Sequence, residues 1–500
     1  MKFFKKQLTK NILISGGSFL SSITIAILLV PYLVKHLGIS AYGFIPLSMF
    51  LTEYISLITQ SISSSITRFF TIKLNENKIN DAQVIFNTAL FGTIAISIIL
   101  TLLFFYPLYN PDIIFNISDT IYSDVRILFI CVFFNFLLSI ISSVFNVSLL
   151  SKNRVDLLQL INIIRIISRV MFIAILFNTY EVSLASVGYA SILSGLIVLV
   201  ISIYYYNLYL TNISISLSLF DRVLASKLMR FSSWVLISQL GFILFTKIDL
   251  ILINIFLGDE KLGEYSVISQ LSGQLRNAFG VLAGVLGPFI LLKYTILKRK
   301  DFSSLLISLY SICQYIVFIP VMIIFVFSED ILYFWLGSNF IFLADTLKLL
   351  ILGVGFMISP TPLYAYINAV GEVKAAAIIS LGTGLMNIIL ALIFINYTAL
   401  GYNGIAIAAL FSIVIRDIII IPLFSFSIIK EHWVKLIILE IRVILYIILF
   451  STFLYLIKFN IEIESIKKLA LVLLSCSLAL LFFVFLISRH MEIKTIMKYA

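Results

Sequence analysis

Cationic side chains interrupt several segments that are otherwise apolar. A charge at membrane depth costs several kcal/mol, so such a residue normally faces a protein interior or a water-filled cavity. Only two carboxylates, Asp249 and Asp417, are close to these cations in the sequence, so positive charge is in excess. The pattern predicts a site for an anionic ligand inside the membrane. The cations are Arg165, Arg169, Lys247, Arg276 and Arg416.

Polar residues recur at helical spacing in the same segments. In residues 158–178, Asn162, Arg165 and Arg169 share one face of a helix. In residues 44–70, Glu53, Gln60 and Arg68 share another. In residues 264–292, small residues accompany Gln270, Gln274 and Arg276; the Ser and Gly positions are best interpreted as helix-packing residues.

Each polar type suits a different role. Arginine is a permanently charged, planar donor for phosphate oxygens. We therefore predict an anion-binding set of Arg165, Arg169, Arg276, Lys247, Arg416 and Arg68, and a set of neutral polar residues that bind sugar, namely Gln60, Asn162, Gln270 and Gln274. The carboxylates that could couple transport to an ion are Asp249, Glu53 and Asp417. Two alternatives stay open: Arg68 could snorkel to the membrane surface, and Arg416 and Asp417 could neutralise each other.

The composition requires a membrane protein. Of the 500 residues, 61% are hydrophobic and 12% are charged, against about 25% charged in an ordinary soluble domain. The apolar runs are long enough for helices, which need about 20 residues to cross a bilayer. The predicted fold class is therefore an all-α integral membrane protein. The basic residues are scattered in short loops, which indicates that they set the membrane topology and do not bind nucleic acid.

About fourteen membrane-spanning helices are expected from these runs. Lys and Arg collect at the N-terminus and in alternate loops, which marks those loops as cytoplasmic and places both termini in the cytoplasm. The predicted spans are 12–34, 44–70, 85–108, 125–150, 158–178, 184–206, 231–256, 264–292, 303–327, 342–369, 375–396, 404–429, 436–457 and 467–488. Pro360 and Pro362 predict a kink or an unwound turn in the tenth of them.

An internal repeat is visible at a lag of six spans. Leu37-Gly38, followed by Gly43, matches Leu257-Gly258, followed by Gly263. Because six is an even number, the two halves would have the same orientation, as in transporters that handle substrate between two repeats. Catalytic and metal-binding motifs are not apparent: Cys131, Cys313 and Cys476 are isolated, and no cofactor or metal is predicted.

Several motifs together resemble bacterial polysaccharide exporters. The segments on which this resemblance rests are Lys247–Gly258 with Gly263-Glu-Tyr265, His36–Gly43, Asn368–Lys374 and Gly401–Ala408. They are similar to the helix junctions of Wzx-like lipid-linked oligosaccharide flippases, for example O-antigen exporters, within the multidrug/oligosaccharidyl-lipid/polysaccharide flippase superfamily. The resemblance implies two six-helix lobes around a central cavity, plus helices 13 and 14. The corresponding boundaries are 1–206, 207–429 and 430–500.

The resemblance also implies the activity. A polyprenyl-diphosphate-linked oligosaccharide, with undecaprenyl diphosphate as the carrier, would cross the cytoplasmic (inner) membrane of a bacterium by alternating access, to supply cell-surface polysaccharide such as O-antigen or capsule. Membrane lipid is the other expected partner, and a polysaccharide polymerase and a chain-length regulator are further candidates. Three alternatives remain: a lipid II flippase, an ion-coupled multidrug exporter of the same superfamily, and a membrane-embedded glycan polymerase, the only enzyme among them.

Overall fold

The computed structural model describes residues 2–49, 69–71, 73–74, 76–152, 154–211, 213–226, 248–461 and 463–488. In this part of the chain the regular structure is helical and no strand occurs, so the prediction of an all-α protein is confirmed. Helices suit these apolar runs because a membrane offers no water to the backbone, and a helix satisfies its own backbone groups. Four predicted site residues lie outside the described residues: Glu53, Gln60, Arg68 and Lys247.

The described residues contain nine helices that are long and apolar enough to cross a membrane. They coincide with the third to sixth and the ninth to thirteenth predicted spans, so the protein is a multi-pass membrane protein. The count of fourteen stays a prediction, because much of the second and seventh predicted spans lies outside the described residues.

The chain folds as two compact units. The first unit comprises residues 1–240 and 253–266. Its main helices are α1 (Lys2–Leu37), α3 (Ile79–Tyr109), α4 (Tyr122–Phe145), the short α5 (Val147–Ser151), α6 (Val155–Thr179) and α7 (Leu184–Tyr209). A further helix covers Ile39–Met49, and short 3-10 turns lie at η1 (Pro111–Ile113), η2 (Asp119–Ile121) and η3 (Leu217–Leu219).

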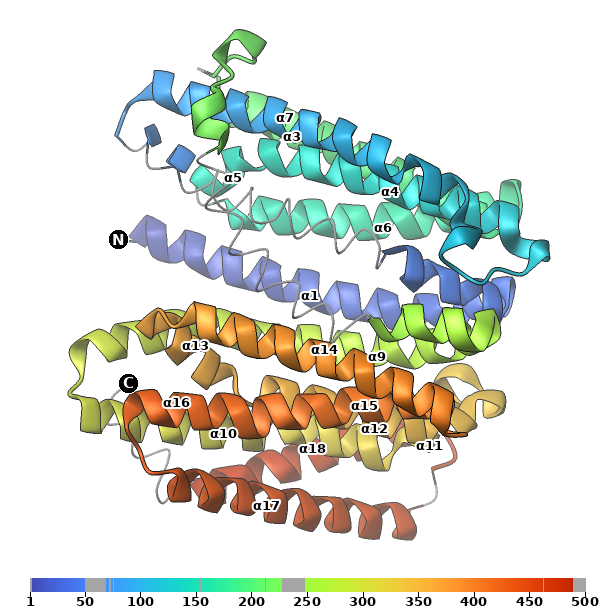
Figure 1. The fold of residues 1–500 in the computed structure, drawn as a ribbon, viewed down its shortest axis with the longest axis vertical. Helices are drawn as coiled ribbons and strands as arrows, with labels where there is room; N and C mark the ends of the chain where they lie inside the picture. Colours follow the sequence, from blue (N-terminus) through green and yellow to red (C-terminus); the bar gives the residue numbers. More distant parts are fainter. Residues whose placement is uncertain are drawn as a thin grey trace. The chain divides into compact units, whose positions relative to one another are not determined.

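Small residues allow α4 and α7 to pack closely within the first unit (Figure 1). Gly188 and Gly195 of α7 face α4, and a Cβ atom on Gly195 would lie 2.2 Å from the Asn135 side-chain oxygen. Ser191, Ser194 and other small residues of α7 are also buried. Packing of this kind holds membrane helices together where lipid provides no hydrophobic driving force.

The two glycines of the predicted repeat share an unusual backbone conformation. Gly38, between α1 and the helix at Ile39–Met49, has φ +84°, and Gly258 has φ +88°. Gly258 interrupts α9 (Ile248–Ile296), which is helical on both sides of it. Since φ near +85° is readily adopted only by glycine, the two junctions match in geometry as well as in sequence.

The second unit comprises residues 241–252 and 267–500. Besides the remaining parts of α9, it contains α10 (Arg299–Val326), α11 (Ser328–Leu336), η4 (Ser338–Leu343), α12 (Ala344–Ile358), α13 (Thr361–Val370), α14 (Val373–Tyr397), α15 (Tyr402–Val414), η5 (Ile415–Ile420), α16 (Ile421–Ile429), α17 (Trp433–Asn460) and α18 (Ile466–Ser488). Within this unit α10 packs against α12, α17 and α18.

Two of its spans are interrupted. The break predicted at Pro360 is present: α12 ends before Ser359, and α13 starts after Pro360. The second interruption was not predicted. Between α15 and α16 the helix widens into a π-helix, η5, and such turns are frequent at functional sites.

Candidate functional site

Arg165 and Arg169 lie on one side of α6 in the first unit. They are four residues apart, so their Cα atoms are separated by about 6 Å along the helix axis. Both side chains are half-buried, and the buried Nε atom of each has no hydrogen-bond partner in the part of the chain that the structure describes. Like charges at this spacing repel each other. The arrangement therefore lowers the stability of the protein unless an anion lies between or beside them.

A third arginine, at the start of the same helix, has hydrogen-bond partners for its guanidinium. Arg154 donates to both carboxylate oxygens of Asp156, at 3.0 and 3.1 Å, and to the Tyr209 hydroxyl at 2.6 Å. No carboxylate within the described ranges makes an ion pair with Arg165 or Arg169. Arg154 thus has a structural role, whereas the described residues give the other two arginines no carboxylate partner.

Two described residues near these arginines carry polar groups. Tyr42, from the helix at Ile39–Met49, is buried and close enough to Arg169 to interact with it electrostatically. Asn162 lies one turn before Arg165, and its amide makes only a 3.5 Å contact with Gln159. Two guanidiniums, an amide and a hydroxyl form a donor-rich set. That chemistry suits a phosphate or diphosphate with an attached sugar.

The predicted residues of the second unit divide into two places. Gln270, Gln274 and Arg276 are half-buried on α9. The Arg276 guanidinium lies over Gly273, whose added Cβ would be 3.8 Å from Nη2. Asp249 is buried near the first described turn of the same helix, with 6% of its surface exposed.

Arg416 and Asp417 form an ion pair inside the second unit. Arg416 Nε and Nη2 donate to the two carboxylate oxygens of Asp417 at 3.1 and 2.7 Å, and the Tyr364 hydroxyl donates to Oδ1 at 2.8 Å. Adjacent residues of a regular α-helix point about 100° apart. Here both belong to the π-helix η5, which changes that geometry. The expected mutual neutralisation is present.

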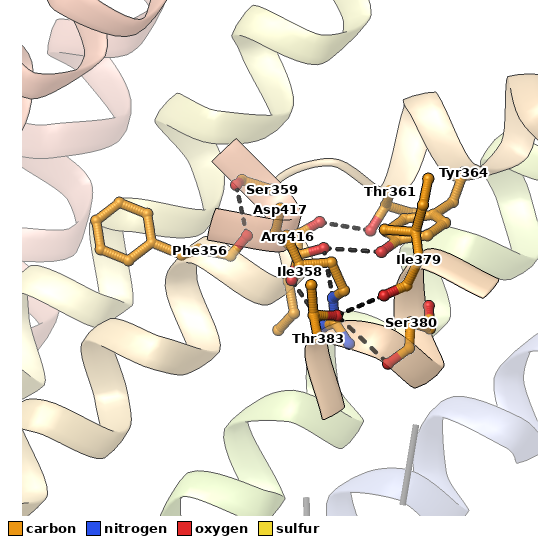
Figure 2. A network of polar contacts seen from close by, with 10 residues as sticks. All are labelled: Phe356, Ile358, Ser359, Thr361, Tyr364, Ile379, Ser380, Thr383, Arg416 and Asp417. Carbon is orange, nitrogen blue, oxygen red and sulfur yellow. Dashed lines mark hydrogen bonds and ion pairs between the residues drawn. The ribbon is translucent and has the colours of Figure 1, made fainter. Parts of the chain in front are cut away.

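Figure 2 shows the elements that surround this pair. Tyr364 comes from α13, which starts directly after the Pro360 break, and α14 contributes Ser380 and Thr383. The Thr383 hydroxyl donates to the carbonyl of Ile379 at 2.7 Å. Tyr364 was not among the predicted site residues; its place two residues after Pro362 was the available signal.

Glu440 was also missed. It lies in α17 and accepts hydrogen bonds from Tyr310 and Gln314 of α10. The signal was a single carboxylate within a predicted membrane span, which is the same criterion that identified the arginines.

Comparison with solved structures shows the fold. Lipid II flippase MurJ, in an inward closed conformation, has a TM-score of 0.71 and 15% sequence identity, over 95% of this chain and 99% of that chain. An inward-facing multidrug resistance MATE family transporter of the MOP superfamily has a TM-score of 0.68 and 13% identity, over 82% and 98% of the two chains. The chain therefore has the fold of this superfamily, whose members compared here are transporters and flippases.

The sequence comparisons extend to a curated protein and to a family. The chain is 24% identical to the uncharacterized membrane protein EpsK of Bacillus subtilis (strain 168) over 422 residues, which are 84% of this chain and 83% of that protein. The family model described as polysaccharide biosynthesis protein matches residues 8–291, more than half of the chain. The chain therefore belongs to the polysaccharide biosynthesis protein family, as the resemblance of its motifs predicted.

Proposed function

We propose that the protein is a flippase for polyprenyl-diphosphate-linked oligosaccharide. It would move this lipid from the cytoplasmic to the outer leaflet of a bacterial cytoplasmic membrane, by alternating access, for the synthesis of a surface polysaccharide. The observation that carries the proposal is the pair Arg165 and Arg169, whose buried Nε donors have no hydrogen-bond partner among the described residues. The family and the superfamily fold support the same class of function.

The diphosphate is the part of the substrate that cannot cross a bilayer unaided. Arg165 and Arg169 would bind it in the first unit, and Arg276 remains a predicted anion-binding residue of the second unit. Arg416 is the least suited of the described cations, because Asp417 already neutralises it. Neutral side chains such as Asn162, Gln270 and Gln274 would contact the sugar. Lys247, Arg68 and Gln60 remain predicted members of the same sets.

A multidrug exporter is the main alternative within the superfamily, and it would bind organic cations. Such a ligand needs a carboxylate in the binding site itself that no cation neutralises. Asp417 is held by Arg416, and the donors on α6 favour an anion instead. A lipid II flippase shares the diphosphate chemistry, so the choice between it and an exporter of surface polysaccharide rests on the glycan. A membrane glycan polymerase would be revealed by product synthesis.

Transport in proteoliposomes tests the proposal. We expect the purified protein to transfer defined polyprenyl-diphosphate oligosaccharides between leaflets. Arg165→Gln and Arg169→Gln should each slow transfer at least about tenfold, since a charge-assisted hydrogen bond contributes about 1.5–3 kcal/mol. Arg126→Gln is the matched control, because Arg126 belongs to the same unit but its guanidinium lies over the Tyr109 ring.

Two results would contradict the proposal. One is transfer at the wild-type rate by both α6 variants, which would remove these residues from the substrate path. The other is transport of organic cations with no transfer of the diphosphate lipid. Competition between lipid II and oligosaccharide carriers of other composition would identify the glycan.

A further inference from the structure

A carboxylate lies between two membrane-spanning helices of the second unit, away from the arginines discussed above. Glu440 of α17 faces the middle of α10. The Tyr310 hydroxyl donates to its Oε1 at 2.7 Å, and Gln314 Nε2 lies 3.3 and 3.1 Å from its two oxygens. Tyr310 and Gln314 are fully buried, and Glu440 is half-buried. Being four residues apart, the two donors share one face of α10.

No cation neutralises Glu440 among the described residues. Arg442 is two positions further along α17, on the opposite side of the helix, and is exposed. Lys435 pairs with Glu431 at 2.6 Å, and Lys458 pairs with Glu329 and Asp330. The helix α16, which also packs against α17, has no ionisable side chain.

The other ionisable groups nearby do not supply a positive charge either. On α10, the charged residues are confined to the first turn. The remaining ionisable side chains on α10 and α18 are Tyr310, Cys313, Tyr315, Lys467, Lys468 and Cys476, and both lysines stand at the start of α18. Asp417, the carboxylate that interacts electrostatically with Tyr310, is itself held by Arg416. Within the described ranges, an ionised Glu440 therefore has two neutral donors and no counter-charge.

Gln314 can form a hydrogen bond with the Glu440 carboxyl group in either protonation state. Its Nε2 donates to the carboxylate in this structure, while its buried Oε1 finds no hydrogen-bond partner in the described part of the chain. A buried polar atom without a partner costs about 1–3 kcal/mol. If the amide turned over, Oε1 would face Glu440 and accept a hydrogen bond from a protonated carboxyl group. Gln314 Oε1 could thus accept the hydrogen bond that a protonated Glu440 would donate.

We propose that Glu440, with Tyr310 and Gln314, is a proton-binding site that couples the contact between α17 and α10 to the proton gradient. On protonation, hydronium transfers one proton to Oε2 and leaves as water, while Oε1 keeps the hydrogen bond from Tyr310. The site suits a proton better than a metal ion, because two donors already point at the carboxylate. Within the described residues no three His, Cys, Asp or Glu side chains gather to hold a metal.

Infrared difference spectroscopy of the full-length protein in lipid bilayers tests the site without any transport substrate. The film is perfused alternately with acidic and alkaline buffer. We expect wild-type protein to show a carboxylic C=O band in acid that Glu440→Gln removes. Glu431→Gln is the matched control, since Glu431 is paired with Lys435 and hydrogen-bonded to Ser303, and it should keep this band.

A second variant separates proton binding from a purely structural role. Gln314→Met keeps Glu440 but removes the acceptor, so the same band should remain and change in frequency. Three results would overturn the proposal: no band that differs between wild type and Glu440→Gln, a band in Gln314→Met that is identical to that of the wild type, or a spectral change that requires sodium rather than acid.

The coupling part of the proposal rests on the proposed flippase function. Glu440→Gln is expected to transfer lipid-linked oligosaccharide at a rate that no longer responds to an imposed pH gradient, whereas Glu431→Gln responds as the wild type does. A variant that still responds would overturn the coupling. If wild-type protein transferred no such lipid, the proposed function would fail, while the infrared result would still decide whether Glu440 binds a proton.

Discussion

At the scale of single residues, the described arginines in or beside the spans differ in whether a carboxylate pairs with them. Arg154 and Arg416 are each held by a carboxylate, whereas the buried Nε atoms of Arg165 and Arg169 meet no hydrogen-bond partner among the residues that the structure describes. All four are arginines in or beside apolar helices, so residue type alone does not separate them. The difference arises from what each side chain meets in the folded chain.

A prediction at this scale concerns Gly263 of the repeat. A Cβ atom there would lie 2.0 Å from the carbonyl oxygen of Ile39, and one on Gly43 would lie 2.7 Å from the Gly263 nitrogen. Gly263→Ala should therefore lower the free energy of unfolding by about 1–3 kcal/mol or more, because backbone must move. Thermal unfolding in detergent measures this. Gly287→Ala, where a Cβ meets no atom within 4 Å, should be neutral, and an equal loss in both variants would contradict the explanation.

At the scale of elements, breaks in helices position the polar groups. The Pro360 break directs α13 so that Tyr364 reaches Asp417, and the π-helix η5 brings Arg416 and Asp417 together. Glycine at position 258 divides α9, whose residues 253–266 belong to the first unit. There, the Asn254 amide donates to the Asn116 carbonyl oxygen at 2.9 Å and its oxygen accepts from the Asn116 nitrogen at 2.8 Å.

The η5 pair leads to a prediction about stability. Asp417→Asn should destabilise the second unit by about 3–5 kcal/mol, since it removes the carboxylate that pairs with the buried Arg416. The double variant Arg416→Met with Asp417→Asn should recover much of this loss, because no charge remains. Thermal unfolding of both variants measures the difference. A double variant as unstable as the single one would show that the pair is not the cause.

At the scale of the whole molecule, polar contacts outside the spans tie helices of the second unit together. Glu431, between α16 and α17, accepts from Lys435 at 2.6 Å and from the Ser303 hydroxyl of α10. Burial raises the pKa of Glu431, but the hydrogen bonds from Lys435 and Ser303 outweigh burial and hold the pKa below its ordinary value of 4.5.

This lowered pKa predicts how stability depends on pH. The folded protein favours ionised Glu431, so its contribution is present above about pH 4.5 and is lost as the pH falls through the lower, folded-state value. Glu431→Gln should reduce stability by no more than about 1 kcal/mol at neutral pH, because Lys435 is largely exposed. In strongly acidic buffer the variant and the wild type should unfold at the same temperature. A difference in unfolding temperature between the variant and the wild type that grows as the pH falls would contradict a lowered pKa of Glu431.

The sequence alone determined the fold class and the location of the spans. A long apolar run in a membrane forms a helix, because a helix satisfies its own backbone hydrogen bonds. Nine predicted spans are therefore present in the described residues at nearly the predicted positions. It also placed Asn162, Arg165 and Arg169 on one face, because helical periodicity is local. The glycine repeat was readable for the same reason, since positive φ restricts the residue type.

Only the tertiary structure decided which of these polar groups are satisfied. Pairing depends on contacts between residues far apart in sequence, such as Tyr364 with Asp417 or Tyr310 with Glu440. The π-helix that accompanies the Arg416–Asp417 pair has no sequence signature. Whether a buried charge is a structural partner or a candidate ligand site depends on the groups that packing brings within hydrogen-bond distance, and helical periodicity carries no information about those groups.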